Sequence, residues 1–146
     1  MKAEIMREFM QTILQTRASF KQAIQRSLKN NKMGITYEML QIMSCLWNNE
    51  DVNQQELANK TFKDKASLTY LINNLEKREL VVRQEYAHDR RNKKILLTTK
   101  GYELREKLQP LLLEIYTSSS ENLETKSLEE MISFLQKVNY EFKEIK

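Results

Sequence analysis

Four cationic side chains fall within five residues of this chain, at Arg90, Arg91, Lys93 and Lys94. An apolar run follows them directly, and the upstream residues 79–86 predict a second short strand. The pattern therefore predicts a β-hairpin with a cationic tip. Such a tip suits insertion beside a polyanion, because arginine can enter a narrow groove where phosphates deepen the negative potential. Most charged hairpin tips are only solvated, so the preceding residues must decide between the two interpretations.

Residues 53–78 predict two short helices joined by a tight turn at 61–63. Asn53 is placed to cap the first helix, with Glu56 completing a capping box, and Asp64 is placed to cap the second. The second helix has apolar residues at i, i+3, i+4 and i+7, a spacing that requires burial of one face. These residues are Leu68, Leu71, Ile72 and Leu75.

The opposite face of the second helix carries side chains that are short, or that form hydrogen bonds without a charge. A solvated face would more often be rich in Lys and Glu, whereas a groove-reading helix needs small donors and acceptors close to base edges. The order helix, turn, helix, strand, cationic turn, strand is that of a winged helix-turn-helix. The residues expected to contact DNA are Lys65, Ala66, Ser67, Thr69, Tyr70, Asn73, Asn74, Asp89, Arg90, Arg91, Lys93 and Lys94.

The hairpin resembles that of the MarR family of bacterial transcriptional regulators, whose signature is Asp-x-Arg followed by Leu-Thr-x-x-Gly. Asp89, Arg91, Leu97, Thr98 and Gly101 stand at the matching positions. The resemblance extends over nearly the whole chain, including the helices at both ends. It implies that Arg91 enters the minor groove, and that Asp89 orients this arginine or braces the wing.

The chain departs from the family pattern at two places. The glycine usual just before the first wing strand is Glu79, which predicts that this turn does not need a positive φ. The arginines common on the recognition helix are replaced by Tyr70 and Asn74. The operator sequence of relatives therefore cannot be transferred to this chain.

Length and composition predict one mainly α domain. The 146 residues include only two glycines and one proline, which favours long helices and few loops. No apolar run approaches the length needed to cross a membrane, and the first residues continue into an amphipathic helix instead of a signal peptide. A single cysteine excludes an intramolecular disulfide framework and favours a reducing cytoplasm.

Charge is distributed unevenly along the chain. Residues 60–107 hold thirteen Lys/Arg against seven Asp/Glu, whereas residues 108–146 hold four against seven. The positive excess therefore coincides with the predicted helix-turn-helix and wing. This segregation indicates a defined face for phosphate more than a general coating of nucleic acid.

The flanking segments predict a dimer. Apolar helical stripes run through the first segment, with an interruption at Arg17, and through the last, and a third helix is expected from near Thr98 to about 118–120. The stripes could pack only on each other within one chain. We instead expect terminal helices that interleave in a two-fold dimer, because paired half-sites need two heads at fixed spacing. The expected interface residues are Phe9, Ile13, Leu128, Ile132, Leu135 and Phe142.

This interpretation divides the single domain into a head at about 36–98 and dimerisation helices at about 1–32 and 99–146. Pro110 lacks a backbone donor and should kink the third helix near Gln109.

Three other features permit a sharper interpretation. Cys45 could sense oxidants, but no cationic neighbour is evident in the sequence, which favours a structural thiol. For His88 we expect phosphate contact or solvation and not metal binding, since one His and one Cys do not make a metal site. The seven methionines, with Trp47, Tyr37 and Phe20, could line a ligand pocket, although such residues more often form core.

Three functions remain to be compared. The first is a dimeric regulator, expected to repress transcription, that binds a pseudo-palindromic operator and is released by a small ligand. The second is a winged-helix module for protein interaction without DNA binding, which pairing of the wing cations would favour. The third, an enzyme, has no support, because the sequence offers no glycine-rich phosphate loop, catalytic set, cofactor motif or metal-ligand cluster. The sequence does not assign ligand-binding residues.

Overall fold

The computed structural model describes the backbone of residues 1–86 and 88–146. Side chains are described throughout this range except at Tyr86 and at residues 89–92. The chain forms two compact units, residues 1–111 and residues 112–146, and each is described by itself.

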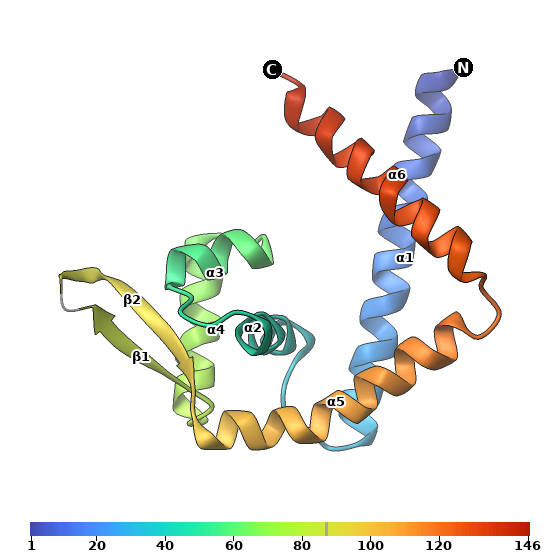
Figure 1. Ribbon diagram of the computed structural model, residues 1–146. Helices are drawn as coiled ribbons and strands as arrows, with labels where there is room; N and C mark the ends of the chain where they lie inside the picture. Colours follow the sequence, from blue (N-terminus) through green and yellow to red (C-terminus); the bar gives the residue numbers. More distant parts are fainter. Residues whose placement is uncertain (87) are drawn as a thin grey trace. The chain divides into compact units, whose positions relative to one another are not determined.

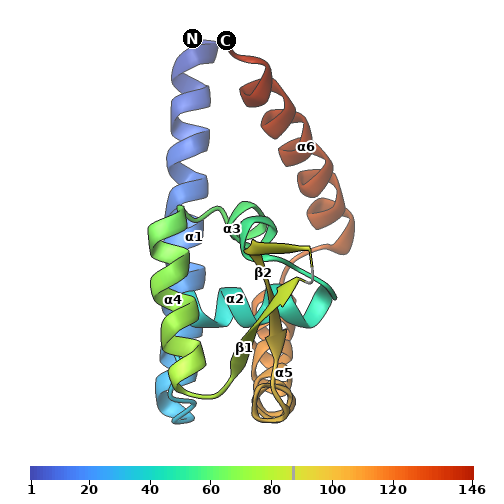
Figure 2. The same cartoon turned by 90° about the vertical axis from the view of Figure 1, so that its left-hand side faces the viewer.

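The fold is mainly helical with one antiparallel hairpin, as the sequence predicted (Figure 1). The hairpin of unit 1 projects from the side that α3 and α4 form, and Figure 2 turns this side toward the viewer. The elements are α1 (Lys2–Asn30), α2 (Tyr37–Asn48), α3 (Gln54–Thr61), α4 (Lys65–Lys77), β1 (Val81–Tyr86), β2 (Asp89–Leu97), α5 (Thr99–Ser120) and α6 (Thr125–Glu144).

The four wing cations belong to strand β2, and two of them, Lys93 and Lys94, lie opposite residues of β1. Strand β2 begins at Asp89, so the backbone of all four predicted cations belongs to it. The pairing runs from Val81 opposite Leu97 to Tyr86 opposite Asp89, with an irregularity between Glu85 and Tyr86. The prediction of a cationic turn was only partly right. Lys93 and Lys94 occupy paired positions, since a projecting two-stranded ribbon has no buried face to exclude charged residues, whereas Arg90 and Arg91 fall in the irregular stretch between the pairs of Asp89 and Lys93.

The hairpin is anchored to the segment that precedes α3. Asn53 forms a bridge with Lys94, and the backbone N–H of Ile95 donates to the carbonyl of Val52 at 3.0 Å. Backbone pairing thus joins the base of the wing to the start of the helix-turn-helix.

Both predicted helix caps are present. The Asn53 side chain accepts from the backbone N–H of Glu56 at 2.7 Å, and its Nδ2 donates to the Glu56 carboxylate at 2.6 Å. Asp64 accepts from the backbone N–H of Ser67 at 2.7 Å. These caps satisfy N–H groups that have no partner within the helix, and they fix where α3 and α4 begin.

The turn after α4 does need a positive φ, contrary to the prediction made from Glu79. This residue has φ 61°, the Leu80 N–H donates to the Leu75 carbonyl, and the Glu79 N–H donates to the Glu76 carbonyl. The two bonds form a Schellman motif, which requires a left-handed residue at this position whatever its side chain. Glutamate therefore occupies a conformation that glycine would adopt without steric cost.

The Leu-Thr-x-x-Gly segment joins the wing to α5. The Thr98 hydroxyl donates to the Glu79 carbonyl at 2.5 Å and accepts from the Gly101 N–H at 3.0 Å. A Cβ at Gly101 would lie 2.3 Å from the Leu80 carbonyl oxygen, so only glycine fits without a shift of the backbone. This part of the family signature has a structural reason: it fixes α5 against the turn before β1.

The core of unit 1 lies where α2 meets α3, α4 and the hairpin. The predicted stripe of α4 is buried, with Leu68, Ile72 and Leu75 fully so. Helix α2 is buried on more than one side, including at Met39 and Met43. The predicted third helix is confirmed as α5, with Pro110 inside it, and the kink stays a prediction.

Candidate nucleic-acid interface

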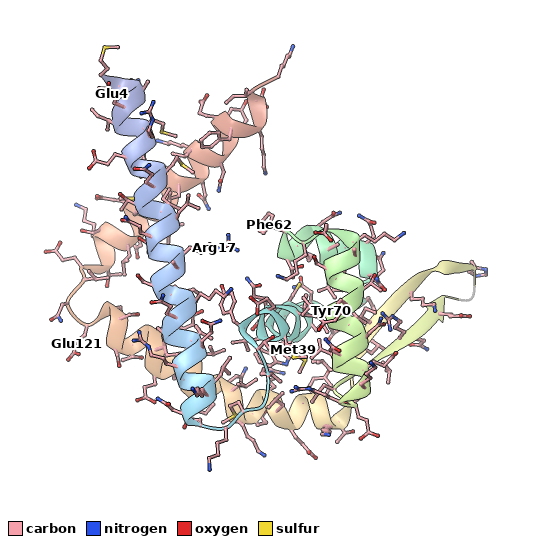
Figure 3. All side chains as sticks on the ribbon, turned by 180° about the vertical axis from the view of Figure 1, so that it is seen from behind. Glu4, Arg17, Met39, Phe62, Tyr70 and Glu121 are labelled. Carbon is pink, nitrogen blue, oxygen red and sulfur yellow. The ribbon has the colours of Figure 1, made fainter. Side chains whose placement is uncertain are left out.

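The outer face of α4 is open to solvent. Ala66, Tyr70 and Asn73 are all exposed, with Tyr70 at 67%, and Figure 3 labels Tyr70 on this helix. The buried stripe of the same helix holds it against the core, so the exposed face has a fixed orientation within unit 1.

A groove of about 700 Å³ runs between α4, the start of α3 and the hairpin. It brings together four residues predicted to contact DNA, namely Lys65, Thr69, Asn73 and Lys93. The other lining residues are Gln54, Gln55, Ala58, Leu68, Glu76 and Arg83.

Gln54, Gln55 and Arg83 were missed as candidates for the interface. The two glutamines follow the Asn53 cap directly, and a polar first turn of the helix that precedes a reading helix could have indicated them. Arg83 gives no signal in sequence, because only the return of β1 past α4 brings it to the groove.

A second hollow of about 690 Å³ lies beside the same helix. Three further candidates, Ala66, Ser67 and Tyr70, line it together with Phe62 and Lys63 from the turn. The predicted contact residues of α4 are therefore divided between two hollows. Asn74 lines neither and is half-buried.

Two of the predicted reading residues form hydrogen bonds within the helix-turn-helix. The Thr69 hydroxyl accepts from Gln54 Nε2 at 2.9 Å and donates to the Lys65 carbonyl at 2.8 Å. The Ser67 hydroxyl donates to the Asp64 carboxylate at 3.1 Å. In this conformation both hydroxyls stabilise the helix pair, and a base contact would have to replace or share these bonds.

Ion pairs involve part of the wing. Lys94 pairs with Asp51, and Arg83 pairs with Glu76 at 3.0 Å with only 15% of the arginine side chain exposed. Lys93 is half-buried in the groove. The side chains of Asp89, Arg90 and Arg91 lie outside the described residues, so their predicted roles stay predictions.

Hydrogen bonds tie the turn of the helix-turn-helix to α2, and an ion pair ties α2 to α1. Lys63 donates to Gln41 at 2.9 Å, and Gln41 donates to the Tyr37 hydroxyl at 3.3 Å. On the same side of α2, Lys21 of α1 pairs with Glu38 at 2.8 Å, and this bond lowers the pKa of the Glu38 carboxyl. The turn before α4 is thus connected through side chains to the long first helix.

Cys45 has the properties of a structural thiol. Burial raises its pKa, which opposes formation of the reactive thiolate. Lys60 is a cationic neighbour that the sequence did not reveal, but its effect is smaller than that of burial. His88 is exposed, and the described residues contain no group of three or more His, Cys, Asp and Glu that could hold a metal ion.

The methionines do not form one pocket in the described structure. Met39 and Met43 belong to the core of unit 1, and Figure 3 labels Met39 there. Met33 instead lines a small hollow near the start of α5. Among the described helices, none has the length and hydropathy to cross a membrane.

Part of the chain is similar to a known protein family. Residues 35–93, which include α2 to α4, β1 and the first half of β2, match the model of the MarR family. The transcriptional regulator SarZ of Staphylococcus aureus is 30% identical over 82 residues, which are 56% of this chain and 55% of SarZ. The chain thus spans about half the length of the curated relatives it matches.

Solved structures extend the similarity over most of the chain. NadR in complex with 4-hydroxyphenylacetate is 28% identical, with a TM-score of 0.73 over 92% of each chain. S. aureus MepR bound to DNA has a TM-score of 0.81 at 24% identity, over 91% of this chain and 97% of MepR. BldR of Sulfolobus solfataricus has a TM-score of 0.83 at 22% identity, over 97% and 99%. The last two show the shared fold.

Proposed function

We propose that this chain is a MarR-family regulator, and that it represses transcription as a dimer bound to a pseudo-palindromic operator. The observation that carries the proposal is the exposed polar face of α4 beside a groove that the wing and α3 complete. Family members are transcriptional regulators and not enzymes.

The charges of this face support duplex DNA as the partner. Lys65 and Lys93 line the groove and form no ion pair within the described residues, and Asn73 of α4 lines the same groove and is exposed. Lysines at the rim position a protein on phosphates, whereas an asparagine can form two hydrogen bonds to adenine in the major groove. We assign these two roles to the lysines and to Asn73.

The apolar residues of α6 support a dimer. In the single chain Leu128 is 40% exposed, Ile132 57% and Phe142 45%. Exposed apolar residues repeated along one helix mark a surface that another chain covers. The occupant we propose is a second copy, because a two-fold pair of heads matches a pseudo-palindromic site. Phe9, Ile13 and Leu135 are half-buried in the single chain and remain part of the proposed interface.

A small effector is the remaining part of the proposal. NadR, at 28% identity, was solved with 4-hydroxyphenylacetate bound, so the fold accommodates an organic ligand in a relative. We propose that an effector releases this chain from DNA by favouring a spacing of the two heads that does not match the operator. Like other DNA-binding regulators, the protein is proposed to act in the cytoplasm, and its free Cys45 is consistent with that compartment.

A module for protein interaction is the second candidate, and the pairing of Lys94 with Asp51 favours it in part. The exposure of Tyr70 and Asn73 opposes it, because neither side chain is covered by the described chain.

Selection of duplexes from a random pool by the purified protein separates the two candidates. We expect enrichment of one pseudo-palindrome whose half-sites lie about one helical turn apart, centre to centre. A pool that stays random at low salt would contradict DNA recognition and leave the interaction module as the better account.

A further inference from the structure

Phe62 is the most unusual residue of the helix-turn-helix. Its side chain is 96% exposed, and its backbone is left-handed with φ 55° and ψ 38°. Left-handed geometry is disfavoured for a bulky residue, and an exposed ring adds almost no packing energy in return. Neither the backbone nor the core explains a phenylalanine here, and such outliers occur at sites of contact.

The hollow beside Phe62 is lined by both apolar and polar side chains. Its apolar and aromatic part consists of Phe62, Ala66, Tyr70 and Leu71, which line the same hollow of about 690 Å³. Figure 3 shows the Phe62 ring clear of the ribbon at the end of α3, with Tyr70 further along α4. The hollow thus joins the turn to the exposed face of the reading helix.

The charges around this hollow suit a polyanion. Lys63 lies in its lining, and Lys65 follows at the start of α4. The two acids of the lining already have partners, since Asp64 caps α4 through Ser67 and Glu38 pairs with Lys21. An apolar contact flanked by lysines, two residues before the cap of the reading helix, favours duplex DNA over an apolar protein surface.

We infer that Phe62 and Tyr70 contact thymine C5-methyl groups in the major groove. Thymine is the base whose methyl group projects into that groove, where apolar side chains recognise it. The inference rests on the proposed DNA-binding function and adds a base preference at the edge of each half-site. Burial of one methyl group corresponds to about a fourfold gain in affinity.

The test uses a duplex selected by the wild-type protein, in which each thymine of one half-site is replaced singly by deoxyuridine. Uracil keeps the hydrogen-bonding pattern of thymine and lacks the methyl group. The wild-type protein is expected to lose about fourfold in affinity at one or more positions. Phe62→Gly should bind the thymine duplex about fourfold more weakly and should show no further loss with uracil at one of those positions.

A stability measurement distinguishes this role from a structural one. Glycine adopts the left-handed conformation freely, so Phe62→Gly should raise Tm by about 2–4 °C while it weakens DNA binding. A residue needed only for folding would lower both quantities. Tyr102→Ala is the matched control, because Tyr102 is an aromatic residue of α5 that is 51% exposed and lines neither hollow of α4.

The possible failures are distinguishable. If the wild-type protein selects no duplex, the proposed function fails and the inference fails with it. If the wild-type protein selects a duplex but Phe62→Gly binds it equally well, the inference alone is overturned. The same holds if Phe62→Gly loses as much affinity as the wild type at every position where uracil replaces thymine. A Tyr102→Ala variant that lost the same affinity as Phe62→Gly would also overturn it, since the effect would not be local to the hollow.

Discussion

The apolar stripes of α4 and α6 have the same helical spacing, but the first is buried within the chain and the second is largely exposed. Leu68, Ile72 and Leu75 of α4 are fully buried within unit 1, whereas Ile132 and Phe142 of α6 are about half exposed. The head therefore completes its core with residues of one chain. Helix α6 leaves part of its apolar face exposed, although Val138 of the same stripe is buried, and we infer that this exposed part is covered by a second copy.

The largest expected effect is that of a charge placed in the exposed apolar stripe of α6. Ile132→Glu should produce monomers, because a carboxylate at the proposed interface would be buried without a partner. Specific operator affinity should fall by about a thousandfold or more, since one half-site cannot compete with non-specific DNA. Sedimentation together with binding to full and half operators measures both effects.

The exposed residue Lys137, on the same helix, supplies the control for this variant. Lys137→Glu places a carboxylate outside the stripe, with an even larger change in net charge, and should leave the dimer intact. A dimeric Ile132→Glu protein with unchanged operator affinity would show that this face of α6 lies outside the dimer interface.

The next largest effect is expected from truncation of a side chain in the buried apolar stripe of α4. Leu68→Ala should lower the free energy of unfolding by about 2–5 kcal/mol, because it removes a fully buried side chain and leaves a cavity. The loss should not depend on protein concentration if the core is complete in one chain. Ile132→Ala should instead destabilise in a concentration-dependent way. Urea unfolding at several protein concentrations compares the two variants. If the loss of unfolding free energy depended on concentration for Leu68→Ala and not for Ile132→Ala, the stripe of α4, not that of α6, would lie in the dimer interface.

The caps and the buried stripe of α4 were predictable because each depends on neighbours within one helix. Asn53, Asp64 and Leu68 are recognised from local spacing alone. The positive φ of Glu79 was not, because it follows from hydrogen bonds to the end of α4 and not from the type of side chain. Arg83 was missed for a related reason: the hairpin brings it to the groove through contacts that the sequence order does not reveal.

Glu79 offers a smaller test at the junction between head and wing. Glu79→Gly should raise the free energy of unfolding by about 1 kcal/mol, since glycine takes the left-handed conformation without the clash of a Cβ. Thermal unfolding measures the change. Glu85→Gly, on strand β1, should destabilise instead. An equal loss of unfolding free energy in both variants would show that the left-handed backbone at Glu79 does not cost stability.

The smallest effect is a pH dependence of the contact between α1 and the head. The Lys21 ammonium lowers the pKa of the Glu38 carboxyl below its ordinary value of 4.5. The folded protein therefore binds fewer protons here than the unfolded chain does, so this pair contributes stability above about pH 4.5. The contribution is lost as the pH falls through the folded pKa. Unfolding of Lys21→Met beside the wild type, between pH 3 and 6, should show a weaker pH dependence in the variant. Identical profiles would contradict the ion pair.

The salt dependence of binding to the selected duplex tests the central claim most directly, that the polar face of α4 and its groove meet DNA. Log affinity should fall linearly with log salt, with a slope of about −0.9 for each phosphate neutralised. Lys93→Gln should reduce the slope by about one unit, and Asn73→Ala should weaken binding at particular base pairs with the slope unchanged. A slope near zero, or no binding at low salt, would contradict the claim.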